Sequence, residues 1–508
     1  GPGTGKTELL SMRVANILRQ TDALSNNILC LTFTEAAATN MTERLARVIG
    51  PDAYKVEINT FHGFGSMVIG RYNEYFYNGA SYQAADELTQ SEILEDILNK
   101  LPFDNPLRVK NKDEFTYLSD LRSMIGDLKK AAVSPDELRQ MTQQNLDFCA
   151  QFNGALAEAF AGRLSAKKLD PIYDLVGLAE HIATSQPKLT FTDEPKLGEI
   201  VAKSLRSALD ESEQLEGTAV TKPITAWKKD WLEKATIGGE SVFVLRDQKK
   251  SEKLNCAADI YAQYLTEMDQ RNLYDFGDMI INVINAIHNN PDLKANLQEQ
   301  YQYVLVDEFQ DTNDAQMRLL AELTDYDDSP NLMVVGDDDQ AIYRFQGADI
   351  SNIQQFAARY SGLAQINLKH NYRSCDGILR SSEAVSQGIA SRLTNVDGTP
   401  KQLVANRAGE AEQQLITATT LEHEFDFIAR KVKELIEQGE DPGQIAIIGR
   451  KHKSLEQVAP YLAHYDIKVS YERQRNVLES PLVQLLVNLA NLVNGIATGD
   501  NNAISLNL

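Results

Sequence analysis

The chain has 508 residues, enough for three or four domains of ordinary size, and its 43% hydrophobic and 24% charged residues are typical of a globular protein with buried cores. Its net charge of −22 at pH 7 excludes an overall basic surface of the kind that binds nucleic acid along its whole extent. Any DNA-binding function therefore requires basic and aromatic side chains to gather locally in a groove, with the acidic residues elsewhere.

The sequence also indicates a cellular setting. It contains no apolar run of about 18 residues, so we expect no membrane span, and its first residues lack the basic start and apolar run of a secretory signal. Its 4 cysteines lie far apart and form no C-x-x-C pair, which argues against a zinc site and against a disulfide framework. These features predict a protein of the reducing cytoplasm.

The chain opens with GPGTGKT, most of a phosphate-binding loop. Glycines at alternate positions let backbone N–H groups turn inward around phosphate oxygens, and a helix that starts near Lys6 points its positive end at the same anion. Lys6 would neutralise the β and γ phosphates of ATP, and the Thr7 hydroxyl would hold Mg²⁺. A chance glycine-rich turn is the alternative. The residues that we predict to bind ATP here are Gly1, Pro2, Gly3, Thr4, Gly5, Lys6 and Thr7.

The chain begins inside this loop, without a methionine, and stops in a polar stretch at Leu508. We therefore expect it to be truncated at both ends.

Short β-branched or apolar runs predict buried strands of a parallel sheet, and helical patterns between many of them indicate an α/β fold with crossover connections. These runs cover residues 27–34, 55–60, 303–307, 332–336, 365–368 and 444–449.

Between residues 86 and 271 apolar residues recur at helical spacing and strand-like runs nearly vanish. Thr89 and Glu92 predict a capping box for one helix, and Ser134 followed by Pro135 predicts the start of another. We therefore predict a mainly helical domain inserted into the α/β domain. Its lysine pairs, at 129–130, 167–168 and 228–229, would more often be solvated faces than phosphate contacts.

The predicted strand at 303–307 leads into a pair of carboxylates, Asp307 and Glu308. Open α/β sheets bind their ligands at the carboxyl ends of the strands. We expect Asp307 to hold Mg²⁺ opposite Thr7, and Glu308 to accept a proton from the attacking water. An acidic turn after a strand is common by itself, but its occurrence with a GKT loop in one chain is much less common.

Two polar segments add candidate residues. Residues 335–348, VGDDDQAIYRFQGA, contain Gln340, which would orient water and sense the γ phosphate, and the aromatic Tyr343 and Phe345, which are available for base stacking. Residues 368–374, LKHNYRS, contain Arg373, a candidate arginine finger. Core packing is the alternative for each aromatic side chain, and NYRS alone is too short to indicate a function.

These segments, in this order, resemble those of superfamily 1A DNA helicases of the UvrD, Rep and PcrA type. Residues 28–45 (ILCLTFTEAAATNMTERL) resemble motif Ia, residues 58–65 (INTFHGFG) resemble motif Ib, and residues 273–279 (LYDFGDM) resemble the "DFDDL" element before the acidic strand. The likeness spans nearly the whole chain, although residues 86–271 add little to it.

The resemblance implies an α/β fold with RecA-like P-loop NTPase motor domains that clamp ATP between them, each with a largely helical insertion. We expect residues 1–85 and 272–374 to form the first RecA-like domain, residues 86–271 the insertion, and residues 375–508 an incomplete second RecA-like domain.

The resemblance further implies movement from 3′ to 5′ on single-stranded DNA, driven by ATP and Mg²⁺, and unwinding of partly duplex DNA in repair, recombination or replication restart. Tyr372 would stack on adenine and Arg373 would reach the γ phosphate. The implied catalytic residues are Lys6, Glu308, Gln340 and Arg373, and the residues implied to face DNA are Phe33, Thr34, His62, Tyr343 and Phe345.

Three departures from the family pattern bear on this interpretation. Residues 32–38 read TFTEAAA where UvrD usually has TFTNKAA, which leans toward the RecB or AddA relatives. Phe345 and Gln346 stand where tryptophan and arginine are common, and Glu8 stands where UvrD has arginine.

Two alternatives therefore stay open: the motor subunit of an AddA/RecB-like helicase-nuclease, and a module that binds DNA and nucleotide without turnover. Motifs V and VI, with a second arginine finger, find no counterpart in the sequence. We expect very weak DNA-stimulated ATPase from residues 1–508 alone.

Overall fold

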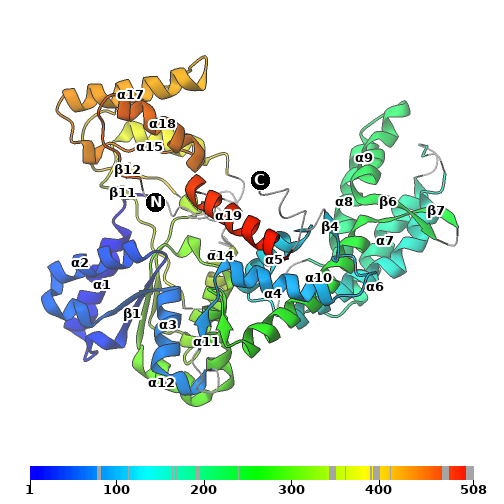
Figure 1. Cartoon of the computed structure of the whole chain (residues 1–508), viewed down its shortest axis with the longest axis horizontal. Coiled ribbons are helices and arrows are strands. Elements are labelled where there is room, and N and C mark those ends of the chain that lie inside the picture. Colours follow the sequence, from blue (N-terminus) through cyan, green and yellow to red (C-terminus); the bar gives the residue numbers. More distant parts are fainter. Residues whose placement is uncertain are drawn as a thin grey trace. The chain divides into compact units, whose positions relative to one another are not determined.

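A computed structural model gives the architecture of the chain, which separates into two compact units, Gly1–Ala411 and Glu412–Leu508 (Figure 1). Each unit is described by itself. The structure describes residues 1–76, 82–111, 114–162, 164–165, 169–189, 195–237, 239–342, 351–360, 362–389, 392, 401–411, 413–471 and 480–498.

The first unit is built on a parallel sheet with the strand order β10-β9-β1-β2. The strands are β1 (Ile28–Thr32), β2 (Glu57–Thr60), β9 (Tyr303–Val306) and β10 (Leu332–Val334). All five residues of β1 are buried, because this apolar strand lies between two neighbours and is covered on both faces. The predicted α/β fold with a parallel sheet is confirmed.

Helices cover both faces of this sheet. Because successive strand residues point to opposite faces, Cys30 joins a core with Leu10 of α1, whereas Leu31 joins a core with Phe64 of α3. Figure 1 shows α1 and α2 on one side of β1, and α3 and α11 on the other. The helices are α1 (Lys6–Gln20), α2 (Glu35–Ile49), α3 (Phe61–Arg71), α11 (Asp278–Asn289), α12 (Pro291–Gln300), α13 (Asp314–Thr324), α14 (Ser351–Arg359) and α15 (Asp376–Ser386).

The described residues between 86 and 271 are mainly helical, as predicted, and they form two cores. The first core lies between α4 (Glu87–Lys100), α5 (Leu118–Lys130) and the later turns of α10 (Arg246–Gln270). The second, distal core includes Phe152, Leu205 and Trp227. Its elements are α6 (Pro135–Ala159), α7 (Asp170–Ser185), α8 (Leu197–Glu213), α9 (Lys222–Trp231), β6 (Leu232–Ile237) and β7 (Glu240–Leu245).

Sequence reasoning missed the antiparallel hairpin of β6 and β7. A signal was available, because a Gly-Gly pair at 238–239 separates two runs of strand-forming residues. Gly239 has a φ of 89°, a conformation that glycine adopts at little cost.

The predicted helix starts have different outcomes. The helix start predicted at Ser134 and Pro135 is confirmed in α6, where Ser134 and Glu137 also form a capping box. The predicted cap at Thr89 is wrong. The N-cap of α4 is Asp86, three residues earlier, and its carboxylate accepts a hydrogen bond from the Thr89 N–H at 2.8 Å. An aspartate carboxylate at the N-cap binds the free N–H groups of the first helical turn better than the side chain of a threonine that lies within that turn.

Two predicted strands, at 365–368 and 444–449, are not strands in the structure. Neither segment pairs with a strand among the described residues, and Ile366 and Ile448 have exposed fractions of 79% and 94%. An apolar run becomes a strand only where a partner supplies ladder hydrogen bonds.

Several short strands complete the first unit, and the described part of the second unit is helical. The strand pairs are β11 (His370–Asn371) with β12 (Val404–Ala405), β3 (Gln83–Ala84) with β8 (Leu273–Tyr274), and β4 (Lys110–Asn111) with β5 (Glu114–Phe115). The second unit contains α17 (Leu421–Glu437), α18 (His452–His464) and α19 (Pro481–Thr498), with a core that includes Phe425 and Leu462. Among the helices that the structure describes, none has the length and hydropathy needed to span a membrane.

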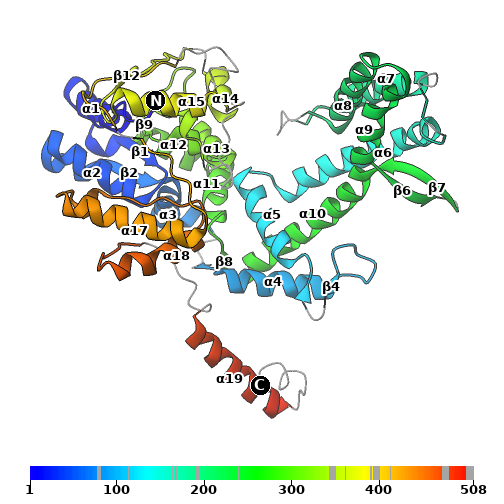
Figure 2. The ribbon, with the colours of Figure 1, turned by 90° about the horizontal axis from the view of Figure 1, so that it is seen from above.

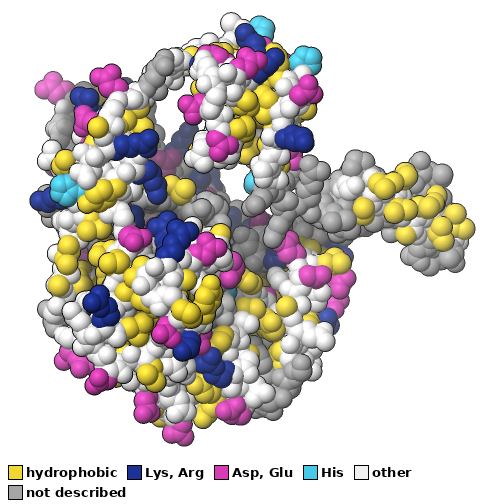
Figure 3. Space-filling model, turned by 90° about the vertical axis from the view of Figure 1, so that its left-hand side faces the viewer, with side chains coloured by type: hydrophobic (Ala, Val, Ile, Leu, Met, Phe, Trp, Pro, Cys, Tyr) yellow, Lys and Arg dark blue, Asp and Glu magenta, His cyan; other side chains and the backbone are white. Residues whose placement is uncertain are grey.

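The surface agrees with the acidic composition. On the face drawn in Figure 3, lysine and arginine side chains occur in separate groups among acidic and apolar ones.

Candidate functional site

The loop at the start of the chain has the geometry of a phosphate cradle. Gly3 and Gly5 have φ angles of 65° and 80°, in the left-handed region, and Gly5 is the N-cap of α1. The Thr4 hydroxyl donates a hydrogen bond to the Gly1 carbonyl at 2.8 Å, which closes the turn. The first turn of α1 therefore starts directly from the loop, so that its free N–H groups lie at an anion-binding end.

Thr7 and Asp307 meet although they lie 300 positions apart in the sequence. The Thr7 hydroxyl donates to Asp307 Oδ2 at 2.8 Å, and the Asp307 N–H donates to the Leu31 carbonyl at 2.9 Å. Burial raises the pKa of Asp307, and the charge of Glu308 acts in the same direction. A hydroxyl and a carboxylate in contact are hard oxygen donors, which fit Mg²⁺.

Glu308 has a left-handed backbone, with φ 49° and ψ 46°. The Gln310 amide donates to Glu308 Oε2 at 2.8 Å, and Gln310 Oε1 accepts from the Asp337 N–H at 2.8 Å. Gln310 thus joins the ends of β9 and β10. A Cβ on Gly336 would lie 2.9 Å from Gln310 Oε1, so this bridge requires glycine. The sequence analysis did not select Gln310 as a site residue, although its position in the DEFQD segment could have identified it.

Lys6 and Gln340 meet at Asp337, a buried carboxylate that sequence reasoning did not select. Lys6 Nζ lies 3.8 Å from Asp337 Oδ2, and the Gln340 side-chain amide donates to the same oxygen. Lys401 also pairs with Asp337. Burial by itself raises the pKa of Asp337, but the charges of Lys401 and Lys6 outweigh this effect, and the pKa is lowered.

The NYRS segment packs its backbone against the loop. The Tyr372 N–H donates to the Gly3 carbonyl at 2.9 Å, and the Asn371 amide donates to the Pro2 carbonyl. A Cβ on Gly3 would lie 2.6 Å from Arg373 Cβ, so the approach depends on glycine. The side chains of Tyr372 and Arg373 are exposed, and their contacts with a nucleotide stay predictions.

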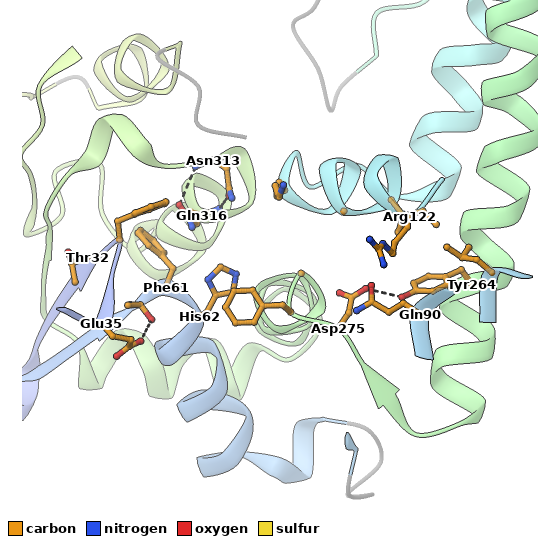
Figure 4. Close-up of a pocket in the computed structure, with 18 residues that line it drawn as sticks. Thr32, Glu35, Phe61, His62, Gln90, Arg122, Tyr264, Asp275, Asn313 and Gln316 are labelled. Carbon is orange, nitrogen blue, oxygen red and sulfur yellow. Dashed lines mark hydrogen bonds between the residues drawn. The ribbon is translucent and has the colours of Figure 1, made fainter. Parts of the chain in front are cut away.

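A cavity of about 550 Å³ lies between the parallel sheet with its covering helices and the inserted helical domain. Phe33 and His62, two of the residues expected to face DNA, line it. Figure 4 shows Phe61 and His62 on one side and Arg122 and Tyr264 on the other.

Thr34, which was also expected to face DNA, is not among the described residues that line this cavity. Thr34 caps α2 by accepting a hydrogen bond from the Ala37 N–H at 3.1 Å. Tyr343 and Phe345 lie outside the described residues.

His62 stacks on Phe276 in this cavity, with ring centroids 3.9 Å apart and an interplanar angle of 22°. Burial lowers the pKa of His62 to about 4, so the ring is neutral at physiological pH. Phe276 has an exposed fraction of 65% and presents an apolar ring to the cavity. Sequence reasoning noted the segment around Phe276 without assigning the side chain a role.

Buried charges lie beside the cavity. Lys129 Nζ of α5 is 2.5 Å from Asp275 Oδ2 and 2.6 Å from Asp278 Oδ1, and the Tyr264 hydroxyl donates to Asp275 at 3.2 Å. Burial raises the pKa of Asp278, an effect that the charge of Lys129 opposes. The expectation that Lys129 belongs to a solvated face is wrong, because this side chain is 1% exposed.

The other lysines of the three predicted pairs have different surroundings. Lys130 pairs with Asp127 at 3.0 Å and lines the cavity. Lys228 lies 3.6 Å from the centre of the Phe243 ring, and Lys167 and Lys168 lie outside the described residues.

Comparisons with known proteins identify the family of the chain. Residues 1–191 and 174–361 match the UvrD/REP helicase N-terminal domain, and residues 366–495 match the UvrD-like helicase C-terminal domain. DNA helicase II of Rickettsia typhi is 28% identical over 454 residues, which cover 89% of this chain and 50% of that protein. ATP-dependent DNA helicase PcrA of Bacillus subtilis is 26% identical over 451 residues, 89% of this chain and 44% of that protein. The chain spans about half the length of these curated relatives. With family matches over most of its residues, the chain belongs to the UvrD/REP helicase family.

Proposed function

We propose that the protein is the motor of an ATP-dependent DNA helicase that moves from 3′ to 5′ on single-stranded DNA and separates duplex DNA ahead of it. The contact between Thr7 and Asp307 at 2.8 Å carries the proposal, because it brings the phosphate loop and the acidic strand end to one point. The relatives DNA helicase II and ATP-dependent DNA helicase PcrA support the same function by their names.

ATP hydrolysis follows from the residues around this point. The loop amides bind the phosphates, and Lys6 neutralises their charge. Thr7 and Asp307 would hold Mg²⁺, which supplies further neutralisation of the phosphate oxygens when bound. Glu308 accepts the proton of the attacking water, and its hydrogen bond with Gln310 keeps the carboxylate oriented.

The ion pair between Lys6 and Asp337 would couple nucleotide binding to DNA binding. A bound γ phosphate competes with Asp337 for Lys6, because both are anions within reach of one ammonium group. Gln340, which donates to Asp337, then senses the change. In the sequence Tyr343 and Phe345 follow Gln340 by three and five positions, and we propose that these two rings stack on bases.

The cavity between the motor and the insertion is the proposed path of the single strand. The Phe33 ring and the stacked pair of His62 and Phe276 offer stacking surfaces for bases, and Arg122 and Lys130 offer positive charge for phosphates. The carboxylates of Glu35 and Asp275 also line the cavity.

The test is ATP turnover with and without single-stranded DNA, together with unwinding of duplexes that carry a 3′ or a 5′ tail. We expect Lys6→Ala to abolish both activities of the complete helicase, and the complete parent helicase to unwind the 3′-tailed duplex alone. Arg13→Ala, an exposed cation on the same helix, serves as the control. Turnover by Lys6→Ala near the parent rate, or equal unwinding of both tails, contradicts the proposal.

A further inference from the structure

Three consecutive carboxylates that follow β10 share one lysine. Lys401 Nζ lies 2.5 Å from Asp337 Oδ1 and 2.6 Å from Asp338 Oδ1. Its distance to Asp339 Oδ2 is 2.8 Å. Burial lowers the pKa of Lys401, but the carboxylates outweigh this effect and the pKa is raised. Lys401 is therefore a charged side chain, 13% exposed, at the centre of an acidic turn.

The two oxygens of Asp337 face different lysines. Oδ1 pairs with Lys401, whereas Oδ2 lies 3.8 Å from Lys6 Nζ and accepts a hydrogen bond from the Gln340 amide. The Gly1 ammonium group is 4.0 Å from Oδ1. As far as the described side chains show, the two lysines are the only cationic side chains within ion-pair distance of Asp337. Because the attraction between charges weakens with distance, Lys401 is the tighter partner and Lys6 the looser one.

The backbone around Lys401 is anchored beside the phosphate loop. Lys401 shortly precedes β12, which pairs with β11, and the Val404 N–H donates to the Lys369 carbonyl at 2.8 Å. Leu403 lies against Gly1, where a Cβ would be 2.5 Å from Leu403 Cδ2. Figure 2 shows β12 near the point marked N, where the chain begins. The position of this lysine is therefore set by β12 and the start of the loop.

A second cation holds the other end of the acidic turn. Arg392 Nε donates to Asp339 Oδ1 at 2.8 Å, and Arg392 Nη2 lies 2.9 Å from Glu383 Oε2 of α15. The Arg392 side chain is buried, so these contacts are shielded from water. The acidic turn is thus tied to two segments outside the phosphate loop, and its shape does not depend on the lysine of that loop.

A γ phosphate that takes Lys6 leaves Asp337 in a buried place, where a carboxylate without a cation is strongly unfavourable. With Lys401 on Oδ1, Asp337 stays paired after Lys6 has left, so the exchange of partners costs little. Without Lys401, Lys6 would be the last lysine within reach, and Asp337 would retain it against the phosphate.

We infer that Lys401 is a positioning residue of the ATPase, which keeps Asp337 paired so that Lys6 is released to bind the γ phosphate. This inference rests on the proposed function and adds to it a residue that acts on the nucleotide through Asp337 and Lys6. Because only the γ phosphate has to draw Lys6 away, loss of Lys401 should affect ATP and ADP differently.

The test uses the whole chain and titration with two fluorescent nucleotides, ADP and a non-hydrolysable analogue of ATP, each with Mg²⁺. Lys401→Met removes the charge and keeps an unbranched apolar stem, whereas Lys401→Arg keeps the charge. The double variant Lys401→Met/Asp337→Asn also removes the carboxylate that would retain Lys6. Lys203→Met, at an exposed position of α8, is the matched control.

We expect Lys401→Met to bind the ATP analogue about tenfold more weakly than the parent, because Asp337 then competes more strongly for Lys6. Its affinity for ADP stays within about twofold of the parent, which also establishes that the loop is folded. Lys401→Arg and the double variant bind the analogue within about threefold of the parent, and Lys203→Met binds both nucleotides as the parent does.

Other outcomes overturn the inference. Equal losses for ADP and the ATP analogue would give Lys401 a purely structural role, and parent-like binding of the analogue by Lys401→Met would give it none. A double variant that binds the analogue no better than Lys401→Met shows that Lys401 does not act through Asp337. These three results leave the proposed function standing, whereas a parent protein that binds neither nucleotide overturns the proposed function itself.

Discussion

At the scale of single residues, Glu308 combines backbone strain with a catalytic position. A non-glycine residue in the left-handed region costs about 1 kcal/mol or more, and the structure holds Glu308 there between Asp307 and Gln310. The strained turn directs the carboxylate toward Gln310 while Asp307 faces Thr7. Adjacent carboxylates can thus serve different roles, one holding a metal ion and the other accepting a proton.

Glu308→Gln tests this division. We expect ATP turnover by the complete helicase to fall by about 10²–10⁴, because the amide cannot accept the proton of water, while affinity for MgATP changes little. The measurements are steady-state hydrolysis and titration with a fluorescent nucleotide. Glu299→Gln, on the exposed side of α12, is the control. Turnover near the parent rate contradicts the role of Glu308 as the base.

His62 should make the protein less stable in acid. Its folded pKa of about 4 lies below the ordinary value of 6.5, so between these pH values the unfolded chain binds a proton that the folded chain does not. Stability therefore falls on acidification through this window, by about 3 kcal/mol for this group.

His62→Phe retains a ring against Phe276 and removes the titrating group. We expect a smaller drop in the thermal midpoint between pH 7 and pH 5 than in the parent. The same drop in both proteins would show that burial of His62 is not the cause.

At the scale of elements, the insertion is anchored to the motor domain by buried charges. Lys129 of α5 meets Asp275 and Asp278, which lie at the start of α11 and also bind one another's backbone N–H groups. A Cβ on Gly277 would lie 3.1 Å from the Lys129 stem, so the lysine passes closely over this glycine. Helix α5 is thereby fixed against the element that carries Phe276.

Lys129→Ala removes the only cation from this cluster, as far as the described residues show, and leaves two buried carboxylates. We expect a loss of about 3–5 kcal/mol in stability, measured by chemical denaturation. Lys130→Ala, its exposed neighbour, should change stability by no more than about 0.5 kcal/mol. Equal effects of the two substitutions would mean that the cluster does not anchor the insertion.

Phe276→Ala tests the stacking surface of the cavity. We expect affinity for single-stranded DNA to fall by about 1–3 kcal/mol at constant salt, the range for loss of one base–aromatic contact. Phe103→Ala, in the insertion and 92% exposed, should leave affinity unchanged. If both variants bind like the parent, Phe276 contributes no base contact.

At the scale of the whole molecule, the first unit contains the phosphate loop, both acidic strand ends and the NYRS segment. The second unit has its own small core around Phe425. A ligand that binds one unit stabilises that unit by mass action and leaves an independent neighbour unchanged.

A nucleotide should therefore raise the melting temperature of one unfolding transition. We expect MgADP at about 100 times its dissociation constant to add about 2.7 kcal/mol to the first unit, measured by calorimetry. Lys6→Ala should abolish the shift. A shift of both transitions, or one that persists in Lys6→Ala, contradicts nucleotide binding at this loop alone.

The sequence by itself determined the features that depend on near neighbours. The glycine pattern of Gly1–Thr7 defined the loop, Ser134 and Pro135 defined a helix start, and a run of four apolar residues before Thr32 defined β1. Motif order indicated the family, because so many ordered segments do not recur by chance.

Only the tertiary structure decided which distant residues meet. Asp337 became the shared partner of Lys6 and Gln340, and Lys129 became buried between two carboxylates. Local patterns carry no information about contacts across hundreds of positions, so a lysine looks solvated and an apolar run looks like a strand until their partners are known. For that reason the strands predicted at residues 365–368 and 444–449 are absent from the structure.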